Sequence, residues 1–155
     1  MLRGLLRSAL ALERQAHSFY LGLKEDLGET PSWEGLRHLI EEEEMHQRIL
    51  EDVAAGRVSE GEMDGLLSGH RFHDVEGIAP LDGELRAAWG ERLSRALADE
   101  EATAAFYVNL ERMSKIPAAK RAYHVLAEME REHAAILRRL LGLPRPEAPE
   151  GGFRS

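Results

Sequence analysis

The chain has 155 residues, of which 43% are hydrophobic and 31% charged, as expected of one soluble domain with a hydrophobic core. Its formal net charge of −8 argues against nucleic acid or an anionic membrane as a partner, because both select basic surfaces. The absence of cysteine excludes disulfides, thiol catalysis and iron–sulfur clusters held by this chain.

The first dozen residues are rich in leucine but do not read as a targeting segment. Arg7 and Ser8 interrupt the apolar run, which continues directly into the first expected helix. No segment approaches the ~18 consecutive apolar residues of a membrane span. We therefore expect a cytoplasmic protein without a membrane partner.

The first half of the chain predicts two long helices. One is expected from about residue 2 to Gly28, and the other from Thr30 and Pro31, a cap and a first helical residue, to Gly56. Steps of three and four residues place one set of side chains on one face of each helix. The two sets are Leu6, Ala9, Glu13, Ala16, Tyr20, Leu23 and Leu27, and Leu36, Leu39, Glu43, His46, Leu50 and Val53.

The second half predicts two more long helices after a long link. Residues 57–83 are expected to cross over with one short helix near Glu60 to Leu67, so that the second and third long helices run parallel. The third helix should begin near residues 81–85 and end by Lys115. The fourth should run from Pro117 to Gly142. Their inward faces carry Leu93, Ala96, Glu100, Thr103, Tyr107 and Leu110, and Tyr123, Leu126, Glu130, His133, Leu137 and Leu140.

We therefore expect residues 1–141 to form one helical domain. Residues 142–155 are rich in proline and glycine and are expected to form a flexible tail.

The two halves repeat the same polar pattern at an offset of 87 residues, the separation of Glu13 and Glu100. The same offset relates five further pairs of residues. These pairs are Phe19 and Phe106, Tyr20 and Tyr107, Glu43 and Glu130, His46 and His133, and Leu50 and Leu137. The chain is thus predicted to be a duplicated helical hairpin.

Four glutamates and two histidines are expected to share the core. A buried ionised carboxylate is costly unless it is paired, protonated or bound to metal, and no Lys or Arg occupies the four inward faces. Two divalent cations would neutralise four carboxylates. One Glu from each of two helices and a Glu-x-x-His from each of two others is the ligand set of di-iron and di-manganese carboxylate bundles.

The order Glu13, Glu43-x-x-His46, Glu100, Glu130-x-x-His133 resembles the rubrerythrin branch of the ferritin-like superfamily, over roughly residues 2 to 141. The resemblance implies an all-α, ferritin-like four-helix bundle that binds two iron ions, for which manganese or zinc could substitute. It implies that Glu43 and Glu130 bridge the metals and that Glu13 and Glu100 are terminal ligands. His46 and His133 would supply nitrogen ligands.

Two tyrosines are further candidate site residues. Tyr20 and Tyr107 lie two turns after Glu13 and Glu100, so their hydroxyls could hold a liganding carboxylate in place. The alternative is that both rings are ordinary core residues.

The chain departs from the rubrerythrin pattern in two ways. Many rubrerythrins have a further Glu where this chain has Thr103, which leaves a more symmetric site here. They also carry a cysteine-rich rubredoxin domain, which a chain without cysteine cannot contain. Here the electrons are therefore expected to come from an external donor protein.

Three functions fit these residues. The first is a di-iron peroxidase that reduces hydrogen peroxide or dioxygen, the second is a ferroxidase that oxidises Fe(II), and the third is a metal-free interaction bundle without enzymatic activity. The resemblance also implies a homodimer.

The glutamates beside the candidate ligands, and two histidines of the link, are interpreted as surface groups. Solvated or salt-bridged positions are expected for Glu41, Glu42, Glu44, Glu101, Glu128 and Glu132. His70 and His73 are expected in a solvated loop. No comparable partner pattern accompanies His17, His38 or His124.

Overall fold

The structure is a computed structural model that describes residues 2–69 and 75–144. Its elements, in chain order, are α1 (Leu2–Gly22), α2 (Lys24–Leu27), α3 (Trp33–Ala54), α4 (Glu60–Gly69), the 3₁₀ helix η1 (Val75–Gly77), α5 (Gly83–Met113) and α6 (Pro117–Leu140). The described part of the chain contains no strand, which confirms the all-α prediction. None of its helices has both the length and the apolar character needed to cross a membrane.

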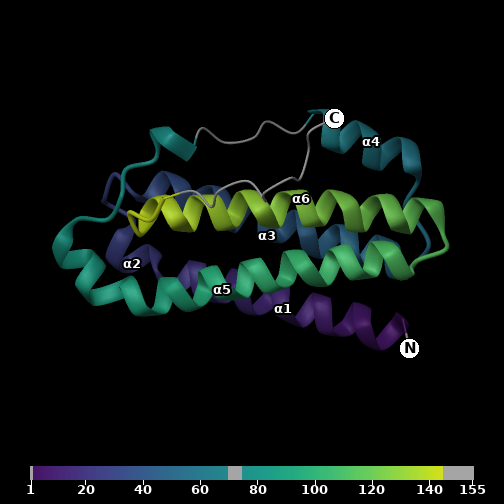
Figure 1. Cartoon of the computed structure of the whole chain (residues 1–155), viewed down its shortest axis with the longest axis horizontal. Coiled ribbons are helices and arrows are strands. Elements are labelled where there is room, and N and C mark those ends of the chain that lie inside the picture. Colours follow the sequence, from purple (N-terminus) through teal and green to yellow (C-terminus); the bar gives the residue numbers. More distant parts are fainter. Residues whose placement is uncertain (1, 70–74, 145–155) are drawn as a thin grey trace, which may run out of the picture.

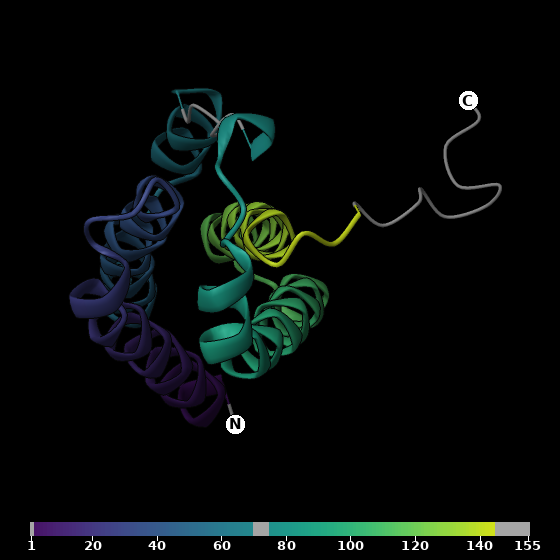
Figure 2. The ribbon, with the colours of Figure 1, turned by 90° about the vertical axis from the view of Figure 1, so that its left-hand side faces the viewer.

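The four long helices are α1, α3, α5 and α6. They lie side by side (Figure 1). α1 packs against α3, and α5 packs against α6. Seen along the helices, the two pairs face each other (Figure 2). α3 and α5 begin at the same end of the molecule, because the link that contains α4 and η1 returns along its length (Figure 1). His70 and His73 of this link, and residues 145–155 of the predicted tail, lie outside the described residues.

The helix boundaries follow the capping signals with two corrections. α1 ends at Gly22 rather than continuing unbroken to Gly28, and after a turn at Leu23 the chain resumes as α2. The predicted start at Thr30 and Pro31 is also early, because α3 begins at Trp33. The Thr30 hydroxyl donates to the Leu27 carbonyl (2.7 Å), so it closes the preceding turn and does not cap α3.

The other boundaries lie close to their signals. Asp82 caps α5 by accepting a hydrogen bond from the backbone N–H of Leu85 (2.9 Å), and Pro117 begins α6. Gly56 and Gly142 follow the ends of α3 and α6 with φ of +70°, a conformation that favours glycine. The short helix expected in the link is present as α4.

Two apolar clusters flank the polar centre of the bundle. One contains Leu36 and Leu137, and the other contains Leu110 and Leu126. Buried apolar side chains cover the layer between them on both sides. That layer contains the polar residues that the duplication repeats.

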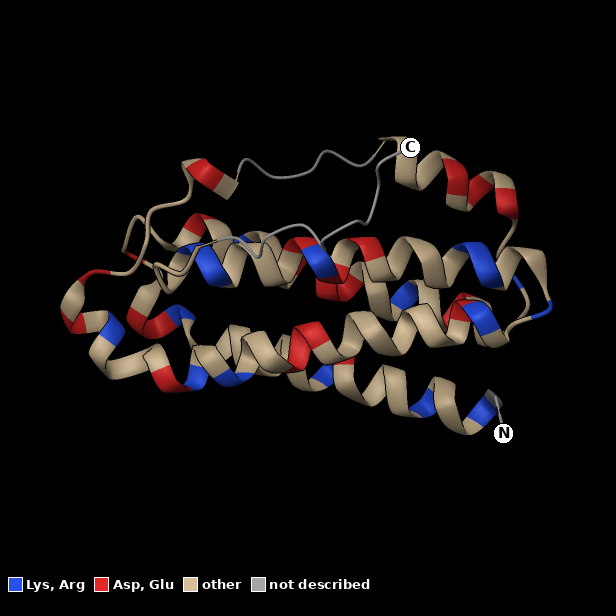
Figure 3. Cartoon of the chain, viewed as in Figure 1, with Lys and Arg blue, Asp and Glu red and all other residues tan. Residues whose placement is uncertain are grey.

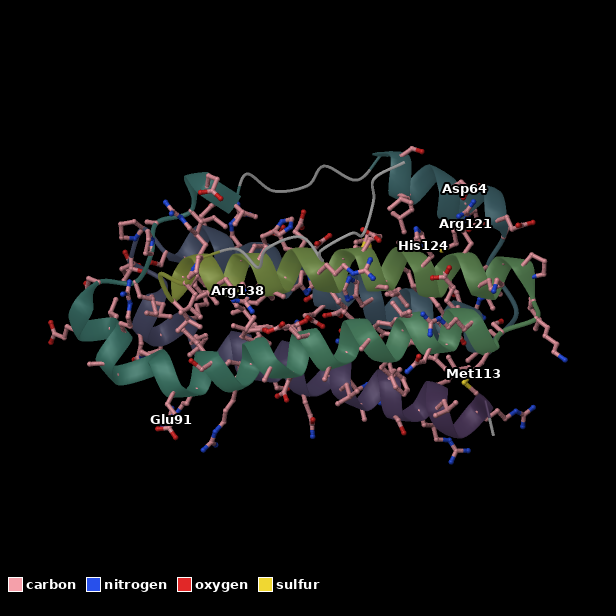
Figure 4. The ribbon with its side chains drawn as sticks, in the orientation of Figure 1. Asp64, Glu91, Met113, Arg121, His124 and Arg138 are labelled. Atoms are coloured by element: carbon pink, nitrogen blue, oxygen red, sulfur yellow. The ribbon has the colours of Figure 1, made fainter. Side chains whose placement is uncertain are left out.

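The link is held against α6. Figure 3 shows acidic residues on α4, and one of them, Asp64, pairs with Arg121 of α6 at 2.6 Å, a contact labelled in Figure 4. Farther along the link, the Ile78 carbonyl accepts from Arg139 Nε (2.9 Å). A Cβ at Gly35 of α3 would lie 3.2 Å from side-chain atoms of Ile78 and Ile136, so α3, α6 and the link are closely packed there.

Candidate metal centre

The structure brings the six predicted ligands together in the middle of the bundle. Each long helix supplies its part: α1 supplies Glu13, α5 supplies Glu100, and α3 and α6 each supply a Glu-x-x-His pair. The six side chains, Glu13, Glu43, His46, Glu100, Glu130 and His133, are at most 4% exposed. Four of them, the two Glu-x-x-His pairs, place one ligand atom each within 4.8 Å of the others.

The two tyrosines connect the halves of the duplication. The Tyr20 hydroxyl donates to Glu100 Oε1 (2.7 Å), and the Tyr107 hydroxyl donates to Glu13 Oε1 (2.6 Å). Each tyrosine therefore contacts the carboxylate of the other half and not the one on its own helix. The exchange is reciprocal, as expected for two halves related by a pseudo-twofold axis.

The two imidazoles lie face to face at the centre. The rings of His46 and His133 are stacked, with centroids 5.0 Å apart and planes inclined by 13°. His46 Nδ1 lies 3.0 Å from Glu130 Oε1 and 3.4 Å from Glu13 Oε2. His133 Nδ1 lies 3.3 Å from Glu43 Oε1 and 3.5 Å from Glu100 Oε2. Both rings thus present Nδ1 to the carboxylates.

Several buried polar atoms at this centre have no hydrogen-bond partner among the described residues. They are both carboxylate oxygens of Glu43, Oε2 of Glu130, Nδ1 of His133 and Nε2 of His46. A buried unsatisfied polar atom costs about 1–3 kcal/mol. The first four of these atoms are oxygen and nitrogen donors that face one another, so the residues fit a bound metal pair.

Burial and mutual repulsion divide the four carboxyl groups into two kinds. Burial raises the pKa of Glu43 and Glu130 well above 4.5, and neighbouring glutamates raise it further. Burial also opposes ionisation of Glu13 and Glu100, but neighbouring histidines and hydrogen bonds outweigh it and lower the pKa of both. Without metal, the two glutamates of the Glu-x-x-His pairs therefore retain protons most readily.

Histidine and tyrosine protons are also held at the centre. Burial opposes the charge on His133, but the surrounding carboxylates of Glu100, Glu42 and Glu43 raise its pKa well above 6.5. Burial, together with the nearby glutamates, raises the pKa of Tyr20 and Tyr107 well above 10. Both tyrosines therefore remain hydrogen-bond donors at neutral pH.

Three polar residues beside the centre were not predicted as part of it. Glu42 and Glu132 are only 5% and 7% exposed, which corrects their assignment to the surface. His38 Nε2 lies 2.9 Å from Glu132 Oε1 and 3.3 Å from Glu42 Oε1, so His38 does have a partner pattern. Its hydrogen bonds with Glu132 and Glu42 raise the pKa of His38 to about 9. Glu42 Oε1 also lies 3.3 Å from Nε2 of His133.

The sequence-based prediction assigned only one row of side chains on each helix to the core. It missed this cluster because α3 and α6 bury a wider part of their surface than one row. The available signal was the duplication itself. At the same offset of 87 residues, His38 and Glu42 correspond to Val125 and Met129, and Glu132 corresponds to Met45. A polar residue in one half that corresponds to an apolar residue in the other shows where the two halves of the duplication differ.

The other surface predictions agree with the structure. The side chains of Glu41, Glu44 and Glu101 are 60%, 56% and 49% exposed, and that of Glu128 is 34% exposed. All four take part in ion pairs. His17 pairs with Glu44, and Arg138, labelled in Figure 4, pairs with Glu101.

A cavity of about 300 Å³ lies between α1 and α5 and extends to the centre. Glu13, Glu100 and Glu130 form part of its inner wall, and apolar side chains such as Phe19 line its sides. Arg95, whose side chain is 78% exposed, lies at its rim. The cavity therefore connects the surface with the carboxylates.

The second half of the site lies in a segment that matches a known family. Residues 91–149 match the rubrerythrin family. The matched segment includes Glu100, Glu130 and His133, and the match confirms the predicted resemblance to this family. No curated protein and no solved structure matches the chain. Within the 155 residues there is no cysteine with which a rubredoxin domain could bind iron.

Proposed function

We propose that the chain is a di-iron oxidoreductase of the ferritin-like four-helix type that reduces hydrogen peroxide with electrons from an external donor protein. The observation that carries the proposal is the set of buried oxygen and nitrogen atoms that have no hydrogen-bond partner in the described part of the chain, on residues repeated by the duplication. Carboxylate and imidazole donors suit iron and manganese. The rubrerythrin match of residues 91–149 favours iron.

The site's geometry supports the proposed ligand roles. Glu43 and Glu130 would hold the metals through carboxylate oxygens that are buried and have no hydrogen-bond partner among the described residues. Glu13 and Glu100 would each bind one metal through the oxygen not held by a tyrosine. His46 and His133 would bind through Nδ1. Two divalent cations would balance the four carboxylates.

The bound iron pair would supply the two electrons that reduce one peroxide to two waters, and two protons complete the balance. The chain's own residues provide the conditions for this reaction. Tyr20 and Tyr107 fix the orientation of Glu100 and Glu13 by hydrogen bonds. The apolar clusters cover the site on both sides, and the cavity between α1 and α5 offers a small oxidant a route to the carboxylates.

Ferroxidase activity is the second candidate, and Thr103 favours it. Many rubrerythrins have an additional Glu at this position. The threonine supplies no carboxylate there, and its hydroxyl donates to the Asp99 carbonyl (2.8 Å). Fe(II) would then be the substrate and dioxygen the oxidant, and Fe(III) would leave the site for storage elsewhere.

The deciding experiment combines metal analysis with rapid mixing. Protein purified from iron-supplemented cells is expected to contain about two irons per chain. After anaerobic reduction, the ferrous protein is expected to react much faster with hydrogen peroxide than with dioxygen. Faster reaction with dioxygen, together with repeated uptake of added Fe(II), would favour the ferroxidase. Failure to bind stoichiometric metal would leave the metal-free interaction bundle.

A matched pair of variants links the metal to the residues. Glu130→Ala is expected to lose metal and turnover together. Glu128→Ala, on the same helix and in an ion pair with Arg131, is expected to retain both. Peroxidase activity without bound iron in Glu130→Ala would contradict the proposal.

A further inference from the structure

The polar cluster beside the centre breaks the symmetry of the duplication. The six candidate ligands and the two tyrosines have equivalents at the offset of 87 residues, but His38, Glu42 and Glu132 do not. All three side chains lie where α3 meets α6. Their equivalents in the other half are the apolar residues Val125, Met129 and Met45.

The two imidazoles consequently have different surroundings on the side away from the carboxylates. His133 Nε2 lies 3.3 Å from Glu42 Oε1, a distance at which the ring N–H donates to the carboxylate. His46 Nε2 is buried and has no hydrogen-bond partner among the described residues. Met129, the equivalent of Glu42, is buried and has no carboxylate.

A carboxylate that accepts from the outer N–H of a liganding histidine fixes the tautomer and orientation of the ring and makes the inner nitrogen a stronger ligand. Glu42 is itself held, because its Oε1 lies 3.3 Å from His38 Nε2, and His38 is also bound to Glu132. The series of contacts from Glu132 through His38 and Glu42 therefore supports His133, whereas Nε2 of His46 has no such partner among the described residues.

We propose that Glu42 is a positioning residue that makes the two metal positions unequal, so that the position beside His133 fills first and binds its metal more tightly than the position beside His46. This inference rests on the proposed function, since it requires that two metals bind. It adds an order of loading that the pattern of the six ligands alone does not predict.

The test is an anaerobic calorimetric titration of the metal-free protein with Co²⁺. We expect two binding events per chain in the wild type, with the first about tenfold or more tighter than the second. Glu42→Met, which places methionine where Met129 stands in the other half, is expected to weaken binding at the position beside His133 about 10–100-fold. The affinity of the position beside His46 is expected to stay unchanged. Glu42→Gln retains an acceptor and is expected to restore most of the difference. Glu41→Met, at an exposed neighbouring position, is the control.

A second readout does not depend on affinity. In the zinc-loaded protein labelled with ¹⁵N-histidine, the ring N–H of His133 is expected to resonate far downfield of that of His46, because only the former donates to a carboxylate. Glu42→Met is expected to remove that shift. Two equal binding events and two similar ring N–H shifts in the wild type would overturn the inference while leaving the di-metal site intact. Binding of no stoichiometric metal would instead overturn the proposed function.

Discussion

The hydroxyl of Tyr20 on α1 donates a hydrogen bond to Glu100 on α5, across the two halves of the duplication, at 2.7 Å. Tyr107 makes the reciprocal bond to Glu13. Each terminal carboxylate of the proposed site is therefore oriented by the half that does not contain it. The halves depend on each other for a complete site, although each carries its own Glu-x-x-His pair.

Tyr20→Phe tests this dependence. The ring continues to fill the core, but Glu100 loses its donor, so we expect metal affinity to fall about 10–100-fold. Loss of the buried hydrogen bond is expected to lower the free energy of unfolding of the metal-free protein by about 1–3 kcal/mol. Equilibrium metal binding and denaturant unfolding measure the two effects. Tyr123→Phe, in the apolar cluster around Leu126, is the control and should leave affinity unchanged.

The metal-free protein is expected to be most stable at mildly acidic pH. The raised pKa of Glu43, Glu130 and His133 gives stability that is lost as the pH rises through their folded pKa values. The lowered pKa of Glu13 and Glu100 gives stability that is present above 4.5 and lost as the pH falls through their folded values. Thermal unfolding in chelator should thus give a higher Tm near pH 5.5 than near pH 7.5.

With metal bound, the protein should instead be more stable near pH 7.5 than near pH 5.5, because bound cations replace the protons between the carboxylates. At about pH 7.5, adding two equivalents of Fe(II) or Mn(II) without oxygen is expected to raise Tm. A Tm that chelator does not change at neutral pH would support the metal-free interaction bundle.

Thr103→Glu tests whether the missing glutamate separates the two candidate activities. Thr103 lines the cavity that contains Glu100, so a carboxylate at position 103 would be added to the oxygen donors that face the site. We expect the ratio of the peroxide to the dioxygen oxidation rate of the ferrous protein to rise. Thr103→Gln, of similar size but without charge, should not reproduce the gain. An unchanged ratio in both variants would show that position 103 does not set the oxidant preference.

Ala16→Phe tests the cavity as the route to the site. Ala16 lines the cavity and is not a candidate ligand, so a larger side chain should narrow the passage without removing a donor. We expect the same metal content at equilibrium but slower oxidation of the ferrous protein by peroxide in stopped-flow mixing. Ala105→Phe, at an exposed position on α5, should have no effect. Equal rates in both variants would indicate another route.

The helix periodicity was enough to place the proposed ligands. Glu13 and Glu43 fall on inward faces at steps of three and four, and the repeat at Glu100 and Glu130 shows that the pattern is not accidental. No Lys or Arg on these faces can pair with the carboxylates, so the sequence predicts bound cations. The side-chain period of a helix is local, so the sequence alone reveals it.

Only the tertiary structure decided which groups meet. The partner of Tyr20 depends on the register of α1 against α5, and the burial of Glu42 and Glu132 depends on how closely α3 and α6 pack. The cavity likewise exists only between two packed helices. Sequence therefore determined which residues face inward. The crossing and register of the helices, set by packing over the whole core, determined their hydrogen-bond partners and made the two histidines unequal.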